Sequence, residues 1–89
     1  MKNLPNDVKA YSRTNTFTHE TVPQKLLKNH NTKVGTWGVI HIEQGEIEYT
    51  IEDNEVVILS KDKLGIIEPT IPHYITPLGE VSFYLEFYK

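Results

Sequence analysis

The sequence predicts an all-β fold, a small antiparallel β-barrel of the jelly-roll type. About six to eight short runs of alternating or continuous apolar residues are separated by turn residues roughly every 6–12 positions. The segment PQKLLKNH at residues 23–30 could form an amphipathic helix, but it is too short to be stable alone. A chain of 89 residues suffices for one small core, so we expect a single domain over residues 1–89.

Residues 14–27, TNTFTHETVPQKLL, are compatible with one or two strands. The next two strands are predicted on either side of a hairpin at Gly45. Residues 39–43 alternate, which places Ile40 and Ile42 toward the core and His41 outside. Counting back from Gly45 adds Gly38 to the inward set. The apolar face continues on a second strand with Ile47, Tyr49 and Ile51.

The C-terminal half contains further strands, each preceded by a turn. The turns are predicted at EDN (52–54), KDK (61–63) and Pro77–Glu80. The strands are EVVILS (55–60), LGIIEP (64–69), HYIT (73–76) and VSFYLEFY (81–88). Because the run at 55–60 is continuously apolar, we expect that strand to be covered on both faces.

Two histidines occupy positions where a barrel of this kind can bring polar groups together. His30 lies in a polar turn ahead of the hairpin, and His73 follows a loop that Pro69 and Pro72 stiffen. The mouth or interior of a small barrel is a place where a few polar side chains converge. We therefore expect His30 and His73 to share a pocket.

This pair suggests a metal site, because imidazole is a good ligand for Zn²⁺, Ni²⁺, Cu²⁺ and Fe²⁺. A catalytic zinc site commonly has three protein ligands, so a third is needed, from Glu86 or from Glu68. The alternative is that both histidines are hydrogen-bonded structural or pocket residues.

Four more residues are candidates for ligand binding. Thr32 and Lys33 could present a hydroxyl and a cation to an oxyanion near His30, although a lysine in a polar turn is usually solvated. Trp37, between two glycines, could stack on a ligand or cover one end of the barrel. Glu68 could orient the His73 imidazole or serve as a buried hydrogen-bond acceptor.

Composition excludes several classes of function. The net charge of −3 argues against a nucleic-acid partner, and no run approaches the roughly 18 apolar residues of a membrane span. The N-terminal residues lack the apolar core of a signal peptide, and cysteine is absent. We therefore expect a cytoplasmic protein without membrane or nucleic-acid partners.

Four stretches carry a resemblance to a known family: HNTKVGTWG (30–38), IHIEQGEIEY (40–49), IIEPTIPH (66–73) and LEFY (85–88). Over roughly residues 4–88 the sequence resembles the N-terminal domain of the tellurite-resistance protein TehB, which also occurs as a small stand-alone bacterial protein. The resemblance implies a cupin-like β-barrel. It also shows departures from a metal-binding cupin, because Thr32 stands where a second histidine is usual and Gly38 where a glutamate is usual.

In TehB a methyltransferase domain that uses S-adenosylmethionine follows this domain. The present sequence ends at Lys89 and has no Gly-x-Gly loop between a strand and a helix. We therefore expect no S-adenosylmethionine binding and no methyltransferase activity.

The resemblance and the two histidines together predict a binding module that holds a divalent metal ion (Zn, Ni or Fe) or a small oxyanion in the bacterial response to tellurite or oxidative stress. Two alternatives stay open: a metal-dependent cupin enzyme acting on a small molecule, and a protein-interaction module without a ligand. We assign no catalytic residue, because no nucleophile–base pair can be assembled. The aromatic residues of the last strand predict a homodimer: Phe83, Tyr84, Phe87 and Tyr88, with Leu85.

Overall fold

The computed structural model describes residues 1–52 and 55–89, and in these residues the regular structure is eight strands and one short 3₁₀ helix. The predicted turn at 52–54 includes Asp53 and Asn54, which lie outside the described residues. The elements are β1 (Ala10–Arg13), β2 (Phe17–Thr18), η1 (Gln24–Leu27), β3 (Trp37–Gln44), β4 (Ile47–Ile51), β5 (Glu55–Leu59), β6 (Gly65–Ile67), β7 (His73–Pro77) and β8 (Ser82–Tyr88).

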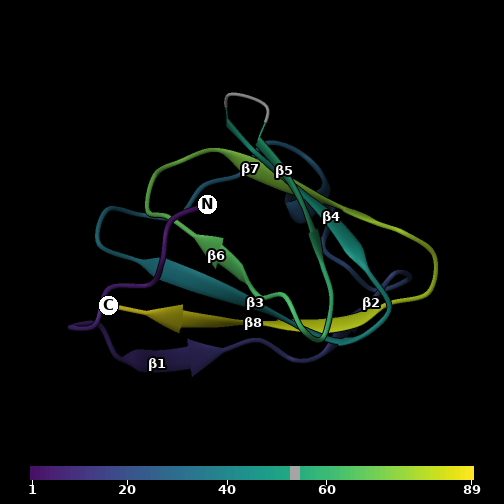
Figure 1. The fold of residues 1–89 in the computed structure, drawn as a ribbon, viewed down its shortest axis with the longest axis horizontal. Helices are drawn as coiled ribbons and strands as arrows, with labels where there is room; N and C mark the ends of the chain where they lie inside the picture. The colour runs from purple at the N-terminus through teal and green to yellow at the C-terminus, as the bar shows by residue number, and fades with distance from the viewer. Residues whose placement is uncertain (53–54) are drawn as a thin grey trace.

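The strands form two antiparallel sheets that face each other (Figure 1). The larger has the order β1-β8-β3-β6, with β2 also paired to β8, and the smaller has the order β5-β4-β7. The predicted all-β antiparallel fold is confirmed. The strands described here do not close into one barrel, because each ladder joins strands of the same sheet and the chain crosses between the sheets at its turns.

The predicted hairpin at Gly45 is a corner between the two sheets. β3 pairs with β6 and β8, whereas β4 pairs with β5 and β7. Gly45 has φ +82°, and a side chain there would meet the Glu80 carbonyl in the connection from β7 to β8. The apolar faces of β3 and β4 therefore oppose each other across the core instead of lying in one sheet.

The core lies between the sheets and is built from the inward side chains of alternating positions. The inward orientation of Gly38, Ile40 and Ile42 is as predicted, and His41 is on the outer face. The buried core residues are Leu26, Ile40, Ile42, Ile47, Tyr49, Leu59, Ile67, Ile75, Val81, Phe83 and Leu85.

β5 differs from its prediction. We expected both faces to be covered, but Val56 is 51% exposed and Ile58 is 44% exposed, whereas Leu59 is fully buried. β5 belongs to one of two sheets that pack face to face, and in this two-layer arrangement only the inner face of the strand is covered. A continuous apolar run is compatible with either arrangement, and the number of layers around the strand decides between them.

The C-terminal strand β8 is an interior strand, paired on one edge with β1 and β2 and on the other with β3. Phe83 and Leu85 point into the core. On the outer face the Arg13 guanidinium lies 3.7 Å from the centre of the Tyr84 ring, which also stacks on His41. Some of the aromatic side chains on which the homodimer prediction was based therefore make contacts within the chain.

Among the described residues, no helix has the length and apolar character that crossing a membrane requires.

Candidate functional site

His30 and His73 are adjacent in space. Their backbones form an isolated antiparallel bridge, in which each N–H donates to the other residue's carbonyl at 2.8 Å. The centres of the two imidazole rings are 5.7 Å apart, in an edge-to-face arrangement. The polar turn that follows η1 is thereby fixed to the first residue of β7, and the main chain, not the side chains, holds the two residues together.

The His73 ring is held in one orientation. It is 3% exposed, and its Nδ1 lies 3.1 Å from the carbonyl oxygen of Ile71. Because a carbonyl can only accept, Nδ1 carries the hydrogen in the neutral ring, and Nε2 is left as an acceptor or metal ligand. The Tyr49 ring packs edge-to-face on the His73 ring, with the ring centres 5.8 Å apart. The Tyr49 hydroxyl donates a hydrogen bond to the Ile66 carbonyl at 2.9 Å.

Both imidazoles are electrostatically biased toward the neutral form. Burial lowers the pKa of His73; the hydrogen bond to Ile71 acts in the opposite direction, and His30 adds to the lowering. Burial also lowers the pKa of His30, and the nearby positive charge of Lys25 lowers it further. Burial raises the pKa of Tyr49, so its phenol stays protonated. At neutral pH the site therefore presents two uncharged imidazoles.

Acidification is expected to destabilise the fold through His73. Above its ordinary pKa of 6.5 the imidazole is neutral in the folded and unfolded states, and its contribution to stability is fully present. As the pH falls below 6.5, the unfolded chain binds a proton that the folded chain does not, so the free energy of unfolding falls by about 1.4 kcal/mol for each pH unit between the two pKa values.

Urea unfolding at pH 7.5 and pH 5.0 measures this loss. In His73→Gln the difference between the two pH values should shrink, whereas in His19→Gln, on an exposed turn, it should stay as in the parent protein. An undiminished pH dependence in His73→Gln would contradict the assignment.

The two histidines line a pocket of about 210 Å³ between η1 and the inner face of the larger sheet. Most of its wall is apolar. The apolar lining residues are Phe17, Pro23, Leu26, Ile67, Leu85 and Phe87.

The polar part of the lining consists of His30, His73, Thr14, Lys25 and Thr32. The Thr32 hydroxyl donates to the Thr36 carbonyl at 2.7 Å, which braces the turn after His30. The Thr14 hydroxyl donates to the Asn15 carbonyl at 2.8 Å and accepts the Leu85 N–H at 3.1 Å. Thr32 thus lines the pocket, but its hydroxyl proton is donated to the Thr36 carbonyl and not to the pocket.

Three predicted ligand-binding residues lie outside this pocket lining. Lys33 is exposed, and Trp37, half-buried, begins β3 opposite Tyr88. Glu68 forms an ion pair with Lys2 at 3.2 Å and lines a second pocket. Glu68 directly follows β6 and lines the second pocket, whereas Ile67 lines the first, and the His73 Nδ1 is held by the Ile71 carbonyl instead.

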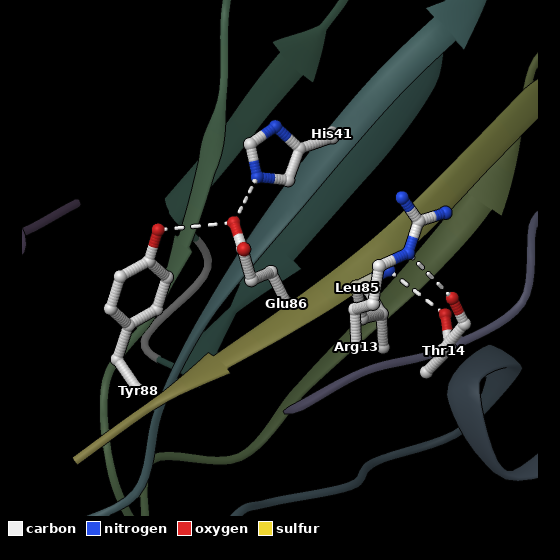
Figure 2. A network of polar contacts seen from close by, with 6 residues as sticks. All are labelled: Arg13, Thr14, His41, Leu85, Glu86 and Tyr88. Carbon is white, nitrogen blue, oxygen red and sulfur yellow. Dashed lines mark hydrogen bonds and ion pairs between the residues drawn. The ribbon is translucent and has the colours of Figure 1, made fainter. Parts of the chain in front are cut away.

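Glu86 is also separated from the histidine pair, which corrects its assignment as a third ligand. Side chains alternate along β8, so Leu85 and Phe87 line the pocket and Glu86 is on the opposite face. There its carboxylate accepts hydrogen bonds from His41 Nε2 at 3.1 Å and the Tyr88 hydroxyl at 3.0 Å (Figure 2).

The chemistry of the donor set follows from this arrangement. Within residues 1–52 and 55–89, no cluster of three or more His, Cys, Asp or Glu side chains is placed to hold a metal ion. Two imidazoles alone would leave at least half of the coordination positions of a metal to water or to a bound ligand. Lys25 and Phe87 were not predicted as pocket residues from the sequence, although the alternation of β8 places Phe87 on the same face as Leu85.

The family model described as TehB-like domain matches residues 12–85. Two curated relatives, both named probable S-adenosyl-L-methionine-dependent methyltransferase TehB, come from Haemophilus influenzae strains 10810 and Rd. They are 28% and 26% identical over 83 residues, which cover 86% of this chain. The chain spans only 29% of the length of either relative.

Solved structures show the same fold. The crystal structure of TehB from Haemophilus influenzae superposes with a TM-score of 0.82 at 28% identity, over 93% of this chain and 32% of that one. A protein from Escherichia coli strain K12 superposes with a TM-score of 0.89 at 16% identity, over 100% and 97% of the two chains. At that identity the second match establishes similarity of fold alone.

Proposed function

The chain belongs to the TehB-like domain family of tellurite-resistance proteins, and from this we propose that it is a binding module that holds a small anion or a divalent metal ion at His30 and His73. The observation that supports the proposal best is that these two residues lie next to each other and line the same pocket. Two backbone hydrogen bonds hold them together, so the arrangement does not depend on a bound ligand.

An anion is the first candidate. Lys25 supplies a positive charge at the pocket, and the His30 ring can donate a hydrogen bond. In this role the module would bind a small acid or an oxyanion in the response to tellurite or oxidative stress.

A divalent metal ion is the second candidate, favoured by one observation at His73. A metal-bound histidine commonly donates its other ring N–H to a backbone carbonyl, as Nδ1 of His73 does to Ile71. His30 and His73 would then be the protein ligands, and zinc, nickel or iron the metals. Neutral imidazoles, the form that burial favours here, are the form that binds metals.

We also propose that the fold is related to the cupin jelly roll. Rolling up a long antiparallel hairpin of eight strands pairs the first with the eighth, the second with the seventh, and so on. β1–β8, β3–β6 and β4–β5 are paired in this way. The bridge from His30 to β7 stands in the place of the second–seventh pair, because β2 pairs with β8 instead.

The proposal does not include catalysis. The activity named for the curated relatives belongs to proteins of which this chain spans 29%, and we do not extend it to this chain. A cytoplasmic location and a homodimer remain predictions; light scattering of the purified protein tests the dimer.

His30→Ala is expected to weaken ligand binding while the fold remains, because the bridge to His73 uses only backbone atoms. Isothermal titration of untagged protein with sodium tellurite and with zinc chloride tests this, and elemental analysis detects metal that is carried through purification. We expect at least about a tenfold loss of affinity for the ion that the parent protein binds.

His19→Ala is the matched control and should bind as the parent does, because His19 lies in an exposed turn. Equal affinity in His30→Ala and the parent would refute the site. A parent protein that binds no anion and no metal would refute the proposed function.

A further inference from the structure

The wall of the His30–His73 pocket is mostly apolar, which restricts what it can bind. Leu26, Ile67 and Leu85 are buried core residues that also face the pocket, and Phe17 and Phe87 complete the wall. The apolar part of this surface cannot replace the water molecules around an anion, and removing them without new hydrogen bonds is costly, so a small oxyanion would contact only the polar side of the pocket. A ligand that fills the pocket must therefore have an apolar body.

The polar groups restrict it further. The hydroxyl protons of Thr14 and Thr32 are donated to backbone carbonyls, and so is the Nδ1 proton of His73. Among the described side chains that line the pocket, the Lys25 ammonium and the His30 ring can still donate to a ligand, and both belong to η1 or to the turn after it. The donors are thus concentrated on one side of an apolar cavity.

We propose that the pocket binds a small organic acid, with its carboxylate at Lys25 and His30 and a compact aromatic or branched apolar body against Phe17, Leu26, Leu85 and Phe87. The proposal rests on the proposed function and names the class of anion that this site takes. A carboxylate concentrates its charge at one end, which matches the one-sided placement of the donors.

The volume sets the size of the body. A dry cavity of about 150 Å³ lined by Leu, Ile and Phe holds benzene. The present pocket, at about 210 Å³, therefore has room for one six-membered ring and a carboxylate. Larger, drug-sized ligands need pockets of about 300 Å³ or more.

Nuclear magnetic resonance titration with sodium benzoate tests the proposal in the parent protein, Lys25→Gln and Lys28→Gln. Acetate has the carboxylate without the ring, and benzyl alcohol has the ring without the charge. We expect benzoate to shift the resonances of His30, His73 and Phe17 saturably, and to bind about tenfold more tightly than either fragment. Lys25→Gln should weaken benzoate binding about fivefold to tenfold. Lys28→Gln should not change it, because Lys28 is exposed like Lys25 but lies outside the pocket lining.

Three results would overturn the inference: acetate binding as tightly as benzoate, benzoate shifts that map to another surface, or no benzoate binding. If tellurite or zinc nevertheless shifts the His30 and His73 resonances, the proposed function stands and only the organic acid is refuted. If no probe shifts them, both proposals fall together.

Discussion

Gly45→Ala is expected to lower the free energy of unfolding by about 3 kcal/mol or more, a large part of the stability of a domain this size. Gly45 has φ +82°, in the left-handed region that costs a residue with a side chain roughly 1–2 kcal/mol. In addition, an alanine Cβ would clash with the Glu80 carbonyl oxygen and lie 3.1 Å from the Val81 Cα. Both are backbone atoms, so the clash is relieved only by moving the chain.

Gly35→Ala is the matched control. Gly35 has nearly the same backbone conformation, with φ +81°, but an added Cβ there meets nothing within 4 Å. We expect it to cost only about 1 kcal/mol. Urea unfolding of the two variants, followed by the fluorescence of Trp37, separates backbone strain from the clash. Equal losses in both variants would show that the contact with Glu80 contributes nothing.

The contact at Gly45 brings together two connections that each run from one sheet to the other. The corner from β3 to β4 packs on the connection from β7 to β8, and the Leu78 N–H donates to the Glu46 carbonyl at 3.0 Å. The requirement for glycine thus comes from the packing of two turns that are distant in the sequence, in addition to the local turn conformation.

Phe83→Ala is expected to cost about 3–5 kcal/mol, the usual range for removing a large aromatic side chain from a core. Phe83 is fully buried and packs on Phe17, with the ring centres 5.8 Å apart. Since Phe17 also lines the histidine pocket, the substitution should weaken ligand binding as well as stability.

Tyr84→Ala, one position along β8 on the outer face, is the control for Phe83→Ala. It removes the contacts with Arg13 and His41 but leaves the core intact. We expect a loss near 1 kcal/mol and unchanged ligand binding. Denaturation curves measured in parallel test the difference, and a larger loss in Tyr84→Ala would contradict the assignment of faces.

The strands and their inward faces could be predicted from the sequence because a strand alternates with a period of two. Ile40 and Ile42 are in the core as that period requires. The partners of each strand could not be predicted in this way, since a turn at Gly45 is compatible with a hairpin and with a corner between sheets. The same limit explains β5, where the exposure of Val56 depends on whether a further layer covers the outer face of the smaller sheet.

The candidate site was predictable only in part, for a similar reason. The stiff loop before His73 and the polar turn at His30 were visible in the sequence, and the structure brings the two residues together. The orientation of neighbouring residues was harder to predict. Glu86 was assigned to the wrong face of β8, although its alternation with Leu85 and Phe87 carried that information. Lys25 becomes a pocket residue only when η1 packs against the sheet.

The two backbone hydrogen bonds between His30 and His73 have a consequence for hydrogen–deuterium exchange. His30 belongs to no strand, yet its amide is as well bonded as one inside a sheet, so we expect it to exchange slowly, unlike its neighbours in the turn. Any fluctuation that lifts this turn from β7 must break both bonds at once. The exchange rates of these two amides should therefore rise and fall together, and they would report how often this side of the pocket opens.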